Sequence, residues 1–167
     1  MEASGIVDEI GDGVSGVAIG DAVFGFGEGT VAEYVILTHW AAKPNSVSFE
    51  VASGLPVIVD TATRALAEVS IKTGQTLLVS GAAGGIGTAI VQLARLRGIN
   101  VIGTASSAKH DYLVSLGAVP TTYGPGLKER LNQLAPIGVD AASDVAGSGI
   151  ISELISIVEC PRQVLSV

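Results

Sequence analysis

The pattern of hydrophobic and polar residues divides the chain into two parts with different predicted structures. In the first part, short runs rich in Val, Ile, Phe and Tyr alternate with Gly and Asp clusters. This pattern is typical of short strands joined by turns and predicts a small antiparallel sheet or barrel. The runs are SGIVDEIG (4–11), DAVFGFG (21–27) and VAEYVILT (31–38). A loop at 44–56 then leads into a segment with apolar residues at helical spacing, 60–70.

From residue 75 onward, apolar strands alternate with amphipathic helices. The first of these strands, TLLVSG, has no polar alternation, which is expected of a strand buried on both faces. Strands that alternate with helices imply right-handed crossovers and a parallel sheet. The fold class is therefore α/β, a Rossmann parallel sheet of about five strands after a β-rich part. The predicted strands are 76–81, 100–106, 120–124, 139–147 and 162–167, and the predicted helices are 85–98, 108–117, 126–135 and 149–158.

A glycine-rich loop joins the first of these strands to the first helix. Ala82-x-Gly84-x-x-Gly87 is the dinucleotide-binding fingerprint with Ala in place of the first Gly. Gly84 lets the backbone approach a pyrophosphate, and Gly87 lets the helix pack closely on the strand. The helix N-terminus supplies N–H groups and a partial positive charge. The sequence thus favours nucleotide binding, with a purely structural loop as the alternative.

The end of the second strand of this part indicates which nucleotide is preferred. An NAD site carries Asp or Glu about 20 residues after the loop, to hold the ribose hydroxyls. Ala105 stands there, followed by Ser106, Ser107 and Lys109. Two hydroxyls and an ammonium group favour a 2′-phosphate, and hence NADPH over NADH. The alternative is that Lys109 is an ordinary solvated helix residue.

The same glycines also fit the short-chain dehydrogenase pattern, which needs a Tyr-x-x-x-Lys pair for proton transfer. The residues four positions after the three tyrosines are Thr38, Leu116 and Leu127. None is a lysine, so that interpretation is rejected.

Composition excludes several other classes of protein. A net charge of −7 argues against a nucleic-acid partner and against an anionic membrane surface. No run of about 18 apolar residues predicts a membrane span, and the N-terminus does not read as a signal peptide. Cys160 is the one cysteine, so no internal disulfide is expected, and a cytoplasmic location is the default.

Several motifs in order resemble the medium-chain dehydrogenase/reductase superfamily. They are MEASGIVDEIGDGVSGVAIGDAVFGF, GTVAEYV, LPVIVDTATRAL, VSGAAGGIGTAIVQLA and GVDAASDVAG. Within it, the chain looks like the zinc-free NADPH:quinone oxidoreductase, or zeta-crystallin-like, branch. The resemblance implies a partial GroES-like catalytic domain over residues 1–60 and a Rossmann dinucleotide-binding domain over residues 61–167. It also implies hydride transfer from NADPH to a small-molecule quinone or α,β-unsaturated carbonyl.

The resemblance assigns roles to individual residues by their place in these motifs. The pyrophosphate loop includes Gly84, Gly85 and Ile86, and the 2′-phosphate contacts are Ser106, Lys109 and Tyr123. Thr61 lies near the nicotinamide, as do the residues after the fourth strand. No side chain must act as an acid. Asp60, Thr61 and His39 are no more than candidates for that role, so the catalytic residue stays unknown. The full cofactor-binding set is Thr61, Ala82, Gly84, Gly85, Ile86, Gly87, Ser106, Lys109, Tyr123, Val145 and Ala146.

No metal is expected. Met1-Glu2 stands where zinc-dependent relatives carry Gly-His-Glu, and no cysteine lies near Pro56-Val57. A catalytic zinc site usually needs three protein ligands.

The resemblance also implies that the chain is truncated at both ends and lacks the sixth Rossmann strand. Two alternatives follow for its function. One is an enoyl reductase of a polyketide or fatty-acid system, and the other is a nucleotide-binding protein without turnover. An open edge at the fifth strand favours pairing between chains, so a homodimer is one expected assembly.

Overall fold

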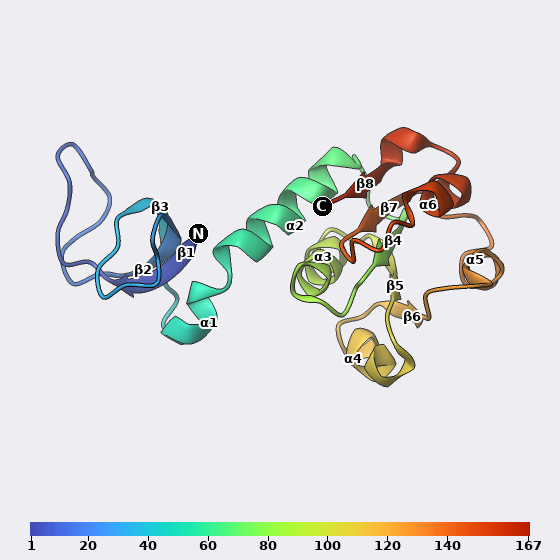
Figure 1. The fold of residues 1–167 in the computed structure, drawn as a ribbon, viewed down its shortest axis with the longest axis horizontal. Coiled ribbons are helices and arrows are strands. Elements are labelled where there is room, and N and C mark those ends of the chain that lie inside the picture. Colours follow the sequence, from blue (N-terminus) through green and yellow to red (C-terminus); the bar gives the residue numbers. More distant parts are fainter. The chain divides into compact units, whose positions relative to one another are not determined.

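The computed structural model describes residues 1–167, which form two compact units, Met1–Ile58 and Val59–Val167 (Figure 1). The first unit is a three-stranded antiparallel sheet in the order β1-β2-β3, followed by a short helix. The second is an α/β unit. The helix α2 begins in the first unit and continues into the second. The first unit contains β1 (Glu2–Ile6), β2 (Ala22–Gly27), β3 (Leu37–Ala42) and α1 (Phe49–Ser53).

The third strand of the first unit begins later than the sequence predicts. The prediction for residues 31–36 is wrong, because β3 spans Leu37–Ala42. Leu37 pairs with Gly27, the last residue of β2, after an irregularity in the register between Phe26 and Gly27. Earlier residues have no strand to pair with, and Val31, Tyr34 and Ile36 are 94%, 77% and 84% exposed.

The second unit contains a five-stranded parallel sheet in the order β6-β5-β4-β7-β8, which confirms the predicted fold class. The strands match the predicted ones but are shorter. β6 ends at Thr121 because it pairs only with the last three residues of β5, so Tyr123 lies beyond the strand. The strands are β4 (Thr76–Ser80), β5 (Asn100–Thr104), β6 (Val119–Thr121), β7 (Ala141–Asp144) and β8 (Val164–Ser166).

Helices cover both faces of this sheet (Figure 1). Leu66, Ile90 and Leu113, from α2, α3 and α4, pack with Leu77 and Val79 of β4 in one apolar cluster. α5 and α6 pack on the other face with Leu78 in a second cluster. Burial of β4 on both faces explains its uninterrupted apolar run. The helices of this unit are α2 (Pro56–Glu68), α3 (Gly85–Leu96), α4 (His110–Ser115), α5 (Leu127–Leu134) and α6 (Ile151–Val158), with short 3₁₀ turns at Ser107–Lys109 and Pro161–Gln163.

Candidate functional site

The strand order reverses between β4 and β7. From β4 the chain crosses over α3 to β5 on one side, and from β7 it crosses over α6 to β8 on the other. In open parallel sheets, ligands bind outside the carboxyl ends of the strands at such a switch point. The residues just beyond these ends are Gly81 and Val145. The candidate site therefore lies where the loops after β4 and β7 begin.

Two contacts hold these loops together. The backbone N–H of Val145 donates to the carbonyl of Ser80 at 3.0 Å. Gly81 has a positive φ of 77°, and a Cβ there would lie 3.0 Å from the Cβ of Ala146. Gly81 is therefore required by its backbone conformation and by the close approach of Ala146.

Thr104, the last residue of β5, anchors the glycine loop. Its hydroxyl accepts from the N–H of Gly81 at 3.3 Å, and its carbonyl accepts from the N–H of Ala82 at 3.1 Å. Thr104 and Ala82 are both buried. Thr104 is not among the site residues predicted from the sequence, although a polar residue that ends an apolar strand is a signal that could have identified it.

Gly84 and Gly87 differ in the space around them. A Cβ on Gly87 would overlap the carbonyl oxygen of Gly81 and lie 2.7 Å from the Cα of Ala82, so the helix packs directly on the loop. A Cβ on Gly84 would meet only the carbonyl of Gly81, at 3.4 Å. Gly84 is exposed, whereas Gly87 is buried. Both observations agree with the separate roles that the fingerprint predicts for these two glycines.

The first turn of α3 has free hydrogen-bond donors. Gly84 is the N-cap residue and provides no side chain to accept from them. Its carbonyl accepts from Thr88, but the N–H groups of Gly85, Ile86 and Gly87 have no acceptor within the chain. These donors, together with the positive end of the helix dipole, form a ready site for an anion such as a phosphate.

The residues after β5 are polar and carry no carboxylate. Ser106, Ser107 and Lys109 are exposed, and their side chains make no hydrogen bond or ion pair. Ala105 is buried where an NAD site would carry its acid, and the next carboxylate in the chain is Asp111. The segment therefore offers hydroxyls and an ammonium group to an anionic ligand.

Tyr123 follows the neighbouring strand at the same edge of the sheet. β5 and β6 are parallel, with Thr104 paired to Thr121, and the N–H of Ala105 donates to the carbonyl of Thr121 at 3.0 Å. The segments that carry Ser106 and Tyr123 thus start side by side. The Tyr123 side chain is 63% exposed. Its contact with a 2′-phosphate stays a prediction.

At the end of β7, Asp144 shapes the turn that carries Val145 and Ala146. Asp144 is 1% exposed, and its Oδ1 accepts from the N–H of Ala146 at 3.1 Å. Thr61, on α2, is also buried, and its hydroxyl makes no hydrogen bond within the chain. The nicotinamide roles of Thr61, Val145 and Ala146 stay predictions.

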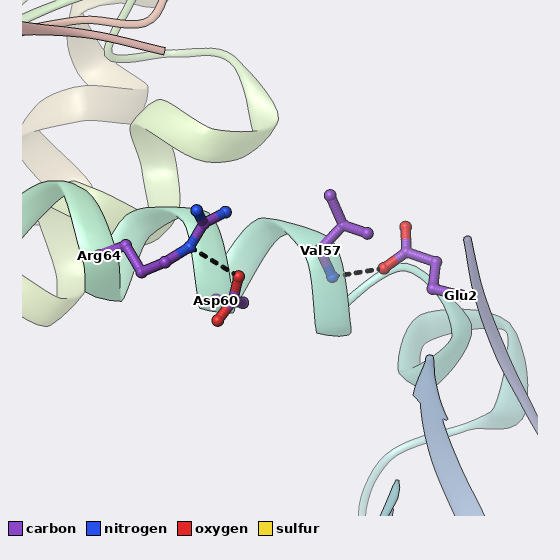
Figure 2. Close-up of polar contacts among 4 residues, drawn as sticks. All are labelled: Glu2, Val57, Asp60 and Arg64. Atoms are coloured by element: carbon purple, nitrogen blue, oxygen red, sulfur yellow. Dashed lines mark hydrogen bonds and ion pairs between the residues drawn. The ribbon is translucent and has the colours of Figure 1, made fainter. Parts of the chain in front are cut away.

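The three candidates for an acid have ordinary surroundings. Asp60 forms an exposed ion pair with Arg64 at 2.9 Å, which Figure 2 shows along α2. Thr61 is a hydroxyl residue with no partner that would ionise it. The ring of His39 is exposed and lies 3.2 Å from the hydroxyl of Thr38. No carboxylate or imidazole is therefore singled out as a proton donor.

No three His, Cys, Asp or Glu side chains come together in a way that could hold a metal ion. None of the helices is both long and apolar enough to cross a bilayer. The Glu2 carboxylate instead accepts from the N–H of Val57 at 2.7 Å, in the first turn of α2 (Figure 2).

The chain is similar to known proteins that include polyketide synthase proteins, a reductase and a synaptic vesicle membrane protein homolog. No family profile matches the chain. It is 40% identical over 119 residues to the spectinabilin polyketide synthase system protein NorB of Streptomyces orinoci, covering 70% of the chain and 6% of that protein. It is 34% identical over 155 residues to a synaptic vesicle membrane protein VAT-1 homolog of Danio rerio, covering 88% and 32%. A 2-methylene-furan-3-one reductase of Solanum lycopersicum is 32% identical over 163 residues, covering 89% and 41%.

Solved structures resemble the chain over nearly its full length. An alcohol dehydrogenase superfamily protein from Novosphingobium aromaticivorans has a TM-score of 0.85 at 27% identity, covering 100% of this chain and 59% of that one. The mycobacterial protein Rv1454c, complexed with NADPH, has a TM-score of 0.84 at 29% identity, covering 94% and 52%. The CurK enoyl reductase has a TM-score of 0.78 at 28% identity, covering 94% and 49%.

The chain spans less than half the length of these curated relatives and about half the length of the solved structures. Within that span, the path of the backbone agrees with that of the solved structures, at TM-scores of 0.85, 0.84 and 0.78. Sequence and fold together show that the chain belongs to the medium-chain dehydrogenase/reductase superfamily, as a part of a GroES-like domain followed by a Rossmann unit.

Proposed function

We propose that this chain is the NADPH-binding part of an oxidoreductase that reduces a quinone or an α,β-unsaturated carbonyl without zinc. The observation that carries the proposal is the glycine loop at the switch point. Its helix N-terminus has three N–H groups without acceptors, and Gly84 leaves room for a phosphate to approach. The NADPH complex of Rv1454c supports the choice of cofactor.

The residues present fit a dinucleotide, group by group. The N–H groups of Gly85, Ile86 and Gly87 hold the pyrophosphate, and Ala82 and Gly87 keep α3 close to β4. Ser106, Lys109 and Tyr123 hold the 2′-phosphate. When NADPH is bound, its nicotinamide supplies the hydride.

The nicotinamide end is assigned to the segment after β7. Val145 and Ala146 lie beside the start of the glycine loop, because Val145 donates to Ser80 and Ala146 contacts Gly81. Thr61 is proposed to lie against the same ring. The buried carboxylate of Asp144 holds this turn in shape through Ala146.

A second candidate function, enoyl reduction on the same scaffold, is favoured by particular relatives. The polyketide synthase protein NorB has 40% identity, and the CurK enoyl reductase has a TM-score of 0.78. The two candidates share the cofactor site and differ in the acceptor. A quinone oxidoreductase of Pseudomonas syringae, with a TM-score of 0.81 at 25% identity, favours the first candidate.

Fluorescence titration with NADPH and with NADH tests the cofactor site. We expect NADPH to bind at least about tenfold more tightly, which corresponds to about 1.4 kcal/mol. Lys109→Gln should remove most of this preference. Lys72→Gln, at the opposite end of the sheet, is the matched control and should leave it unchanged, since Lys72 is also an exposed lysine. Equal affinity for the two nucleotides would contradict the proposed 2′-phosphate site.

Measurements of turnover distinguish quinone reduction, enoyl reduction and nucleotide binding without turnover. NADPH oxidation is followed with phenanthrenequinone and with an enoyl thioester. Faster reaction with the quinone supports the first candidate, and faster reaction with the thioester supports the second. Tight NADPH binding without oxidation by either acceptor supports a nucleotide-binding role without turnover.

A further inference from the structure

Arg130, on α5, binds the loop between β6 and α5, a contact that the sequence does not suggest. Its Nε donates to the hydroxyl of Thr121 at 3.3 Å, and its Nη1 donates to the carbonyl of Pro125 at 2.9 Å. Its Nη2 donates to the carbonyls of Thr122 at 2.8 Å and Gly124 at 3.4 Å. One guanidinium group therefore contacts four residues of the strand end and the loop.

The two carbonyls that share Nη2 belong to the residues on either side of Tyr123. The Thr122 carbonyl fixes the peptide group that precedes Tyr123, and the Gly124 carbonyl fixes the peptide group one residue beyond it, so the path of the backbone through Tyr123 is restricted on both sides. The Tyr123 side chain is 63% exposed and makes no hydrogen bond of its own. Its position therefore depends on the backbone around it rather than on packing of its ring.

The loop has few other polar contacts. Residues 122–125 make no backbone–backbone hydrogen bond. Buried or partly buried carbonyls without partners are costly, at about 1–3 kcal/mol each, so Arg130 is the main source of order in this segment. A planar guanidinium can serve several carbonyls at once, which a lysine ammonium on a flexible stem does less well.

Arg130 is also an unneutralised cation. The single ion pair of the chain joins Arg64 to Asp60, so no carboxylate pairs with Arg130. The oxygens that it binds are uncharged. Its charge lies at the edge of the sheet that also carries Lys109, in a chain whose net charge is −7. Arg130 and Lys109 therefore add two cations at this edge, on segments that also carry the carboxylates of Asp111 and Glu129.

We infer that Arg130 is a positioning residue, which holds Tyr123 in place for a 2′-phosphate and so contributes to the preference for NADPH over NADH. This inference rests on the proposed function. Arg130 acts through the loop, because Nε, one Nη1 donor and both Nη2 donors are already engaged with Thr121, Pro125, Thr122 and Gly124.

The test compares Arg130→Lys, Tyr123→Ala and the double variant with the unaltered chain. Lys128→Gln is the matched control, because Lys128 is a cation on the same helix that binds the carbonyl of Ser156 instead. Dissociation constants are measured for NADPH, for NADH and for 2′,5′-ADP. Hydrogen–deuterium exchange of residues 122–126 is measured without nucleotide.

Arg130→Lys keeps the charge but loses the fork of donors. We expect it to weaken the binding of NADPH and of 2′,5′-ADP by about tenfold, and the binding of NADH by less than about twofold. In the Tyr123→Ala background it should have little further effect, since the two residues act together. Exchange in the loop should become faster in Arg130→Lys and stay unchanged in Lys128→Gln.

Three results would overturn the inference. Unchanged NADPH affinity and loop exchange in Arg130→Lys would show that the guanidinium does not hold the loop. Equal weakening of NADPH and NADH would show a general structural role. Full additivity with Tyr123→Ala would show that Arg130 acts independently of Tyr123. If the folded, unaltered chain binds neither nucleotide, the proposed function fails, and the selectivity role fails with it.

Discussion

Gly84→Ala separates the folding role of the glycine loop from its proposed binding role. Gly84 has φ −82° and ψ 174°, a backbone conformation that alanine adopts readily. The added Cβ meets only the carbonyl of Gly81, at 3.4 Å, which is ordinary van der Waals contact. The substitution therefore fits the folded chain. The same Cβ occupies the space through which a pyrophosphate would approach α3.

The expected magnitudes follow from these contacts. Replacing a glycine N-cap by alanine costs at most about 1 kcal/mol of folding free energy. Nucleotide affinity should fall by more than about tenfold, or 1.4 kcal/mol, because the Cβ separates the phosphate from the free N–H groups. Gly84→Ala should thus reduce the free energy of nucleotide binding by more than it reduces the free energy of unfolding.

Gly87→Ala is the matched counterpart, with the opposite expected result. Its Cβ would lie 2.7 Å from the Cα and 2.8 Å from the carbonyl carbon of Ala82, so the backbone must shift. Overpacking of this kind costs about 1–3 kcal/mol, partly offset by up to about 1 kcal/mol of helix propensity. Urea denaturation and NADPH titration of both variants provide the measurements. If Gly84→Ala binds NADPH as tightly as the unaltered chain, the proposed close approach of phosphate to this loop is wrong.

Three further predictions concern stability and pH. A hydrogen bond from its own backbone N–H and a second from the hydroxyl of Ser48 lower the pKa of Glu50 below its ordinary value. The contribution of the Glu50 carboxylate to folding stability is therefore present above the pKa that Glu50 has in the unfolded chain. It is lost as the pH falls through the lower pKa that Glu50 has in the folded chain. In an NMR titration, Ser48→Ala should therefore raise the pKa of Glu50 toward its ordinary value, and an unchanged pKa would contradict this. Ser143 is fully buried, and its hydroxyl has no partner, so Ser143→Ala should leave the urea-unfolding free energy unchanged or raise it by up to about 1 kcal/mol. A loss above about 1 kcal/mol would point to a hidden partner. The carboxylate of Asp140 accepts from the N–H of Thr76 at 2.8 Å, so Asp140→Ala should cost about 1–3 kcal/mol in the same assay, and a neutral result would refute the importance of this bond.

The sequence by itself was sufficient for the strands of the second unit, for its helices from α3 onward and for its glycine loop, whereas α2 begins at Pro56, earlier than the predicted residue 60. Apolar runs without alternation identified strands that are buried on both faces, and helical spacing identified the helices between them. α4 ends at Ser115, two residues before the predicted end of this helix at Gly117, and Gly117 has φ 85° while Ala118 donates to Leu113 at 3.0 Å. These features depend on neighbouring residues in the chain, so a local pattern contains the information.

Only the tertiary structure decided which residues meet. Thr104 anchors the loop because β5 pairs with β4. The sequence of neither strand by itself indicates that the two are neighbours in the sheet. The start of β3 at Leu37 depends on where β2 ends, so a run rich in Val and Ile was wrongly predicted as a strand. Arg130 reaches the carbonyls around Tyr123 only because α5 packs back beside β6. Register and contacts between distant segments come from the packing of the whole sheet, and no short pattern in the sequence contains them.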